Sequence, residues 1–352
     1  MAETSGARPA RPTLNLAGQD KAALADGLLH LMISEDLHGL YACEALFNNW
    51  QNGDHAYFDR RVFDFGKAFK VKLGADANTT LFAGRIMALE AEFPEGEAAR
   101  LRVLAEDRFQ DLRMTRRTRT FSDLSDADLM RQIAGEHGLT TDINLNGPTH
   151  KVLAQVNQSN LAFLRERARA IDAELWMDGS QLIAKQHDAR PQTTLKLSYE
   201  NQLRSFTVLA DLSHQRTSVT ASGWDVAGKK ALKYEATDQV IRSELGNDES
   251  GVAILQAQLG ARKEALAHTV PLTSDEAQAE AEAFFKLNAR RFVVGRGVAE
   301  VNTQLRAGNR VELLNLGKLF SGIYYLCEVR HIFDGRGLRT EFTAERAGIG
   351  KV

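Results

Sequence analysis

The sequence predicts a mainly β fold with α+β insertions: two similar β-barrel domains, a small helix–hairpin domain and a helical insertion. Strand-like alternation of apolar and polar residues dominates both ends of the 352-residue chain. Helical spacing occurs in the middle and again before the last strands. One hairpin pattern also occurs twice, at 81–108 and 319–346. The domains expected from these observations are residues 1–120, 121–190 and 191–352, with the helical insertion at about 247–290.

The first domain is expected to be a β-barrel that follows a loose lead-in over residues 1–11. The segment Leu28–Ser34 is apolar, and Lys67–Leu73 alternates as a half-buried strand does. Pro94-Glu95-Gly96 is typical of a turn. These signals favour strands over helices up to about residue 120.

The middle segment predicts two helices and a hairpin. Ser125 followed by Asp128 fits a capping signature, and Gly138 is expected to end that helix. Asn157 or Ser159 can cap the second helix, whose apolar stripe begins at Leu161. An Asp-Gly pair between two apolar runs, at 178–179, then predicts a tight hairpin.

Strand patterns resume near residue 194 and continue to Arg346, with one interruption. Thr273 and Glu276 resemble a capping box, and an Ala/Glu-rich run follows to about Arg291. The second barrel is therefore expected to be split by a helical insertion.

The repeated hairpin suggests an internal duplication. Leu81-Phe82-Ala83-Gly84 opens the first copy and Leu319-Phe320-Ser321-Gly322 opens the second. A glycine within a strand pattern usually marks a bulge or sharp bend, as small barrels need at their corners. A trimer of such chains would present six similar barrels in a ring.

Composition argues against several functions. A formal net charge of −2 provides no basic field for nucleic acid or membrane. No apolar run approaches the ~20 residues that span a bilayer, and the N-terminus lacks the apolar region of a secretory signal. Cys43 and Cys327 stand alone, as expected of reduced thiols. The histidines are scattered, so neither a metal nor a cofactor is expected, and Val293–Glu300 fails as a dinucleotide fingerprint.

Two charged features leave alternatives open. The carboxylates at Glu90–Glu92 and Asp123–Asp128 could serve as the acid pair of a glycosidase, although caps and solvated strand faces explain them more simply. One dense basic run is a solvated loop or a candidate docking patch for an acidic neighbour; it consists of Arg113, Arg116, Arg117 and Arg119.

Three blocks of residues resemble the late control protein D family of contractile phage tails, and the N-terminal hub part of the VgrG spike proteins of type VI secretion. The resemblance covers nearly the whole chain, from about Pro12 to Arg346. The first block is the hairpin opened by Leu81, Phe82 and Gly84. The second block carries Asn157, Ser159, Phe163, Leu164, Trp176, Asp178 and Gly179. The third block carries Phe320, Gly322, Tyr324, His331, Thr340, Phe342 and Arg346.

The resemblance implies a non-enzymatic baseplate hub of a phage tail, tailocin or secretion-like particle. The hub would be a homotrimer, assembled in the bacterial cytoplasm, that adapts a sixfold inner tube to a trimeric spike. VgrG chains continue into an OB-fold and a spike, whereas this sequence stops soon after Arg346, so the spike is expected on a separate chain. The expected partners are the inner tube protein, the spike protein, other baseplate subunits, and tape-measure or effector cargo. The rival interpretations are a cell-wall hydrolase and a carbohydrate-binding module.

Overall fold

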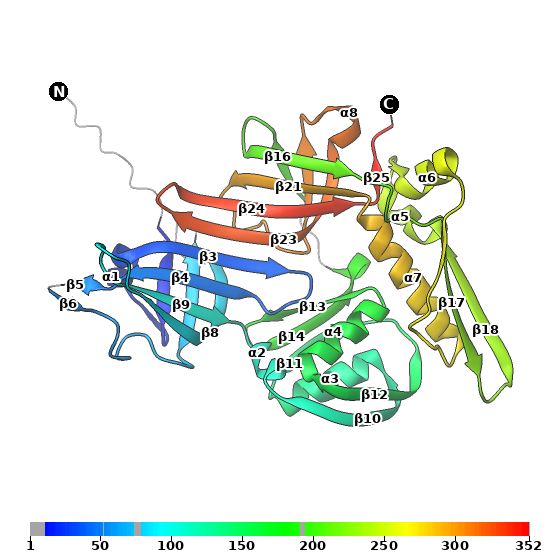
Figure 1. The fold of residues 1–352 in the computed structure, drawn as a ribbon, viewed down its shortest axis with the longest axis horizontal. Coiled ribbons are helices and arrows are strands. Elements are labelled where there is room, and N and C mark those ends of the chain that lie inside the picture. The colour runs from blue at the N-terminus through cyan, green and yellow to red at the C-terminus, as the bar shows by residue number, and fades with distance from the viewer. Residues whose placement is uncertain (1–10, 52, 74–78, 191–193, 352) are drawn as a thin grey trace.

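A computed structural model describes residues 11–51, 53–73, 79–190 and 194–351 of the chain. The structure is mostly β, with about half of the residues in strands, which confirms the predicted fold class. Figure 1 shows two curved groups of strands side by side, with a compact α+β unit below them and a helix and hairpin at one side. Apart from Arg11, the expected lead-in lies outside the described residues.

The first half of the chain forms short and long antiparallel strands. Its elements are β1 (Thr13–Leu16), β2 (Gln19–Asp20), α1 (Ala22–Gly27), β3 (Leu28–Asp36), β4 (Ala42–Asn48), β5 (Trp50–Gln51), β6 (Asp54–His55), β7 (Ala68–Leu73), β8 (Thr79–Glu92) and β9 (Arg100–Glu106). Apolar residues alternate along β4, β7 and β9, so one face of each strand is buried.

The middle unit combines three helices, the first of which is very short, with two small sheets. Its elements are α2 (Gln110–Arg113), β10 (Arg116–Ser125), α3 (Asp126–Glu136), β11 (Thr140–Asn144), β12 (Thr149–Ser159), α4 (Asn160–Ala170), β13 (Ala173–Asp178), β14 (Gln181–Gln186) and the 3-10 turn η1 (His187–Ala189). Ser125 caps α3 and Ser159 caps α4, each by accepting a hydrogen bond from a backbone N–H of the first turn. Both predicted helices and the predicted hairpin are therefore confirmed.

The last part of the chain returns to strands around an insertion. The strands of the second half are β15 (Thr194–Ser198), β16 (Leu203–Ala210), β21 (Val293–Glu300), β22 (Arg310–Leu314), β23 (Gly322–Asp334), β24 (Gly337–Arg346) and β25 (Gly348–Ile349), with the short helix α8 (Gly317–Phe320). The insertion consists of β17 (Ser218–Asp225), β18 (Lys230–Thr237), η2 (Asp238–Ile241), α5 (Arg242–Leu245), β19 (Glu249–Ser250), α6 (Gly251–Leu259), β20 (Lys263–Ala265) and α7 (Ser274–Arg290).

The insertion differs from the helical segment predicted at about 247–290. It contains strands as well as helices, and the β17–β18 hairpin that precedes residue 247 shares its core. The reason is packing: Ala281 and Phe285 of α7 are buried in one cluster with Val219 and Ala221 of β17. The predicted division into residues 1–120, 121–190 and 191–352 stays a prediction.

Both halves belong to one 13-stranded sheet. Its main path runs β16-β21-β24-β23-β3-β4-β9-β8-β7-β1-β2, and β15 and β22 branch from β23. The halves meet where β23 pairs with β3 in antiparallel register from Glu328–Asp36 to Phe333–Leu31. Because of this junction, Phe333 of the second half lies in the hydrophobic core of the first.

The two halves repeat one strand order. The first half reads β3-β4-β9-β8-β7, and the second reads β16-β21-β24-β23-β22. The ladders also carry bulges at matching places. The bulge at 28–30 on β3 matches the one at 203–205 on β16, and the bulge at 86–88 on β8 matches the one at 326–328 on β23. Bulges are local irregularities that ordinary strand pairing does not require, so their repetition supports the predicted internal duplication.

The residue matches within this duplication differ from those that the sequence suggested. When the bulges are aligned, Gly84 is equivalent to Tyr324, which lies two residues beyond Gly322. A shift of two residues keeps every side chain on the same face of its strand, so the apolar pattern matches in either alignment. Neither glycine interrupts a strand: Gly84 lies inside β8, and Gly322 begins β23.

Candidate functional site: a buried ionic joint between the units

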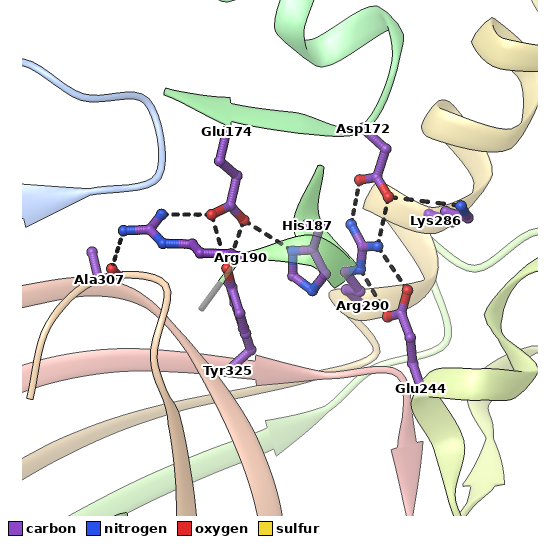
Figure 2. Close-up of polar contacts among 9 residues, drawn as sticks. All are labelled: Asp172, Glu174, His187, Arg190, Glu244, Lys286, Arg290, Ala307 and Tyr325. Carbon is purple, nitrogen blue, oxygen red and sulfur yellow. Dashed lines mark hydrogen bonds and ion pairs between the residues drawn. The ribbon is translucent and has the colours of Figure 1, made fainter. Parts of the chain in front are cut away.

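The middle unit is fixed to the second half by a cluster of buried polar side chains. Glu174 of β13 accepts hydrogen bonds from His187 Nδ1 (2.9 Å), from Arg190 Nη1 (2.6 Å) and from the hydroxyl of Tyr325 on β23 (2.8 Å). Arg190 also donates to the carbonyl of Ala307, in the loop before β22. Figure 2 shows the carboxylate of Glu174 enclosed by these three side chains.

The electrostatics of this cluster favour a fixed ionised carboxylate. Burial opposes the ionisation of Glu174, but the hydrogen bond from His187 and the charge of Arg190 outweigh it and lower its pKa to about 2. Burial and the nearby Glu174 carboxylate raise the pKa of Tyr325, which therefore stays a neutral donor. The guanidinium of Arg190 lies over the ring of Trp176, 4.1 Å from its centroid, so a cation–π contact adds to its hydrogen bond with Glu174.

A second cluster joins the middle unit to the insertion. Arg290, at the end of α7, lies between two carboxylates: its Nη2 is 2.7 Å from Asp172 Oδ2 and 2.7 Å from Glu244 Oε1 of α5. Lys286 lies 3.8 Å from the same Asp172 carboxylate. Burial and the hydrogen bonds of Arg290 act in opposite directions on Glu244, and its pKa is lowered on balance. Figure 2 shows both clusters side by side, with His187 between them.

A third cluster connects α3, β12 and α7. His150 is buried between two carboxylates, with Nε2 2.9 Å from Asp126 and Nδ1 2.7 Å from Glu276. Burial lowers the pKa of His150, but the two carboxylates outweigh it, and the pKa is raised. Arg167 adds a hydrogen bond of 2.7 Å to Asp126. When it is doubly protonated, the ring can donate to both acids.

These clusters, which we call the ionic joint, suit a structural role. Every carboxylate in them is engaged by at least one arginine, histidine or hydroxyl. A cavity of about 60 Å³ lies beside Glu174 and Asp172, and a larger cavity of about 370 Å³ is lined by His187, Glu244 and Tyr325. Removing one partner from such a buried pair leaves an uncompensated charge and destabilises strongly. The joint therefore holds three units in one fixed arrangement.

The first predicted block packs inside the first half. Leu81 and Phe82 are buried in its core. Gly84 allows a close backbone approach, because a Cβ there would lie 2.2 Å from the carbonyl oxygen of Glu106 on β9.

The second block is distributed over the middle unit. Phe163 and Leu164 are buried in its core, and Ser159 caps α4. Asn157 has a positive φ of 48° at an irregularity of the β10–β12 ladder, a backbone conformation that asparagine tolerates. Trp176 belongs to the ionic joint through Arg190. In the β13–β14 hairpin Asp178 pairs with Gln181, so the two turn residues are Gly179 and Ser180.

The third block converges on Arg346. Its guanidinium donates to the carbonyls of Leu319 and Ser321 and lies 4.7 Å from the ring centroid of Tyr324. The hydroxyl of Tyr324 donates to the carbonyl of Phe320. A Cβ on Gly322 would lie 2.4 Å from Arg346 Nη1, so a larger residue here would displace the guanidinium. These residues anchor α8 to the sheet.

The remaining residues of the third block face the core of the second half. His331 is 1% exposed, and its Nδ1 lies 3.1 Å from the hydroxyl of Thr340 on the neighbouring strand. Burial lowers the pKa of His331 to about 4, so the ring is neutral at pH 7. Phe342 covers Gly297, where a Cβ would lie 2.3 Å from its ring. The glycines of Val293–Glu300 therefore make room for aromatic rings in a strand.

The basic run is a strand rather than the loop that was the first expectation. Arg116, Arg117 and Arg119 lie on β10, because β12 supplies a partner strand. Arg117 and Arg119 share the carboxylate of Glu136, and Arg113 pairs with Glu106. Two carboxylates thus balance half of the charge of the four arginines, and the docking patch stays a prediction.

Sequence reasoning did not identify the ionic joint. Glu174 offered one signal, because it is a lone carboxylate at the start of an otherwise apolar strand. Arg290 and Glu244 offered none, since both lie in charged, helix-forming segments and only the fold brings them together. Among the described residues, no cluster of three or more metal-type side chains is gathered. None of the described helices is long and apolar enough to cross a membrane.

Comparison with solved structures identifies the fold. The chain is similar to the 43 kDa tail protein of prophage MuSo2 from Shewanella oneidensis, with a TM-score of 0.71, 12% identity, and coverage of 96% of this chain and 98% of that chain. A tail protein from Neisseria meningitidis gives a TM-score of 0.70 at 12% identity, with coverage of 97% and 98%. The Escherichia coli c3393 protein, described as a type VI secretion component that resembles the T4 tail proteins gp27 and gp5, gives a TM-score of 0.57 at 14% identity, with coverage of 96% and 79%.

The chain therefore shares its fold with phage tail proteins and a type VI secretion component, which confirms, at the level of the fold, the resemblance expected from the sequence. The chain belongs to the Alg8 N-terminal domain family, whose sequence model matches residues 47–334. No curated protein matches the sequence significantly.

Proposed function

We propose that this protein is the structural hub of a contractile injection particle and acts as a homotrimer. In this role it adapts a sixfold inner tube to a threefold spike, and it is assembled in the bacterial cytoplasm. Its partners are the tube protein, the spike protein, other baseplate subunits and the cargo that passes through. The mechanism is mechanical, since the protein holds the spike in place while the particle contracts.

The duplicated sheet is the observation that carries this proposal. The two halves share a strand order and matching bulges, and they lie side by side in one continuous sheet. Three such chains would supply six similar halves, so a threefold assembly could match a sixfold partner. The ionic joint supports the same role, because it locks the middle unit and the insertion onto this frame.

The structure gives the rival enzyme little support. Glu90 is 57% exposed and forms an ion pair of 3.0 Å with Arg102, while Asp123 is 66% exposed and pairs with Lys151. Both are surface ion pairs, and such pairs contribute little to the stability of a protein. The matched family is associated with a glycosyltransferase, which keeps sugar chemistry as the second candidate.

Two experiments test the proposal. The mass of the purified chain, measured by native mass spectrometry, is expected to be three times the 38.9 kDa of one copy. Electron cryo-microscopy of the particle should place three copies between tube and spike. A monomer that is absent from tail-like particles would contradict the hub.

A cell-wall zymogram tests the enzyme. We expect no clearing by the purified protein. Clearing by the wild type that Glu90→Gln abolishes would favour the hydrolase and overturn the structural role.

A further inference from the structure

The junction between the two halves is asymmetric, and this asymmetry leaves two unmatched edges. Within the chain, β23 of the second half pairs with β3 of the first. Their counterparts in the repeated order are β8 for β23 and β16 for β3. The β23–β3 junction joins a strand near the end of one repeat to the first strand of the other, which is a head-to-tail contact. The same contact can form between two chains, with β8 of one chain beside β16 of the other.

Within the part of the chain that the structure describes, both edges lack a second strand partner, apart from an isolated bridge of Tyr199 to Leu203 at the start of β16. The part of β8 from Ala88 to Glu92 pairs with β9 on one side, and its pairing with β7 ends at Arg85. Among the described residues, β16 has β21 as its one ladder partner. An unpaired edge presents backbone N–H and C=O groups that are ready to bind another strand.

On β8, side chains that face the core are uncovered where their counterparts on β23 are buried. Val329, His331 and Phe333 on β23 are 0%, 1% and 7% exposed, because β3 and the first half cover them. Their counterparts by bulge alignment are Leu89, Ala91 and Phe93. Leu89 is only half-buried, Ala91 is exposed, and Phe93 is 69% exposed although it contacts the rings of His55 and Phe58.

The edge of β16 shows the same contrast. Leu31 and Ile33 on β3 are 1% and 0% exposed at the internal junction. The counterparts, Phe206 and Val208, are only half-buried. Large apolar side chains exposed along an unpaired edge are typical of an interface that is not yet filled.

We infer that β8 of one copy pairs with β16 of a second copy of this chain, in antiparallel register, as β23 pairs with β3 within one copy. In the β23–β3 register, Arg330 lies opposite Ser34 and His331 lies opposite Ile33. The same register between β8 and β16 places Glu90 opposite Leu209 and Ala91 opposite Val208. Phe93 then enters the core of the second copy beside Phe206. The inference specifies the contact between copies of the proposed trimer and rests on that function only for the number of copies.

Disulfide trapping tests the register in the full-length chain. Glu90→Cys combined with Leu209→Cys is expected to give covalent dimers and trimers under mild oxidation, because both substituted positions lie on the solvated face. Arg330→Cys with Ser34→Cys is the matched positive control and should form an intramolecular bond. Glu90→Cys with Arg204→Cys is the negative control, since five residues displace the thiol by about 17 Å. The single variants control for Cys43 and Cys327.

A second measurement tests the interface without cysteines. Phe93→Ser is expected to weaken self-association by on the order of tenfold or more, as loss of a central aromatic anchor does, and to leave the melting temperature of one copy unchanged. Phe65→Ser is the control, because Phe65 is 55% exposed in the same half but lies outside the β8 edge.

The outcomes separate this inference from the proposed function. The chain can be a trimer by mass and yet form no disulfide between positions 90 and 209, or form it no better than the control pair at 90 and 204 does. That result overturns the strand pairing and leaves the proposed hub function intact. A chain that is monomeric and absent from particles overturns both.

Discussion

At the scale of single residues, Glu174 has the most partners in the joint. It is 6% exposed and accepts hydrogen bonds from three different side chains that belong to two units of the fold. A carboxylate in that position fixes the direction of each donor as well as balancing the charge of Arg190. Its role is therefore better tested by removing the charge than by removing the side chain.

Glu174→Gln should destabilise the protein by about 3–5 kcal/mol, because Arg190 would remain buried without a counter-charge. The measurement is the free energy of unfolding in urea at pH 7. Asp128→Asn is the control, because Asp128 and Arg131 form an ion pair with side chains that are 56% and 48% exposed, and its loss should cost less than about 1 kcal/mol. Similar losses in the two variants would contradict the structural importance of the joint.

His331 predicts a dependence of stability on pH. Burial lowers its pKa from 6.5 to about 4, so the unfolded chain binds a proton in this interval that the folded chain does not. The contribution of the neutral ring to the free energy of unfolding is thus fully present above pH 6.5 and is lost as the pH falls towards 4. The shift corresponds to about 3 kcal/mol.

His331→Asn should remove this contribution, because asparagine can keep the contact with Thr340 but does not titrate. The measurement is the difference in unfolding free energy between pH 7 and pH 4.5, which should become smaller in the variant than in the wild type. His214→Asn, at an exposed position, should leave the difference unchanged. An unaltered pH dependence in His331→Asn would rule out this histidine as the cause.

At the scale of elements, β21 shows how glycine shapes a strand. Gly295 and Gly297 lie under the rings of Phe206 and Phe342, and a Cβ at either position would approach a ring to within 2.3 Å. Their counterparts on β4 are Cys43 and Ala45, which are also small. Both halves therefore keep small residues at this point of the sheet, where bulky neighbours need the space.

Gly297→Ala should destabilise by about 1–3 kcal/mol, the usual cost of overpacking. Phe342→Leu in the same chain should recover part of the loss, because a smaller side chain leaves room for the methyl group. The measurement is thermal unfolding followed by circular dichroism. Gly335→Ala is the control, since nothing lies within 4 Å of its Cβ position.

Local sequence signals predicted the elements well where the chain itself supplies the cause. The caps at Ser125, Ser159 and Thr273 and the hairpin at Gly179 depend on neighbouring residues, and all four occur as expected. A helical insertion was predicted and α6 and α7 occur in it, but local signals did not show that the β17–β18 hairpin packs against α7. The ionic joint escaped prediction for the same reason, since its members meet only through the tertiary fold.

At the scale of the whole molecule, the β23–β3 junction couples the two halves. Phe333 is 7% exposed and belongs to the core of the first half although its strand belongs to the second. Destabilisation of one half should therefore reach the other through this strand.

Phe333→Ala should cost about 3–5 kcal/mol and raise hydrogen exchange in both halves, because the cavity opens at their shared strand. Phe93→Ala is the matched variant at the equivalent place in the repeat, and it should leave exchange within one copy unchanged. Peptide-resolved hydrogen–deuterium exchange distinguishes the two. Faster exchange confined to the β3–β9 region would show that the halves are not coupled.

The covalent link between the halves also has a consequence for assembly. In a closed ring of six units, three of the six junctions would form when each chain folds, and only three would remain to be made by encounter. Every encounter costs translational and rotational freedom, so three chains lose less of it than six separate units would. The tether keeps the second unit at a high local concentration, so the proposed trimer would close its ring even where a cell holds only a few copies of the protein.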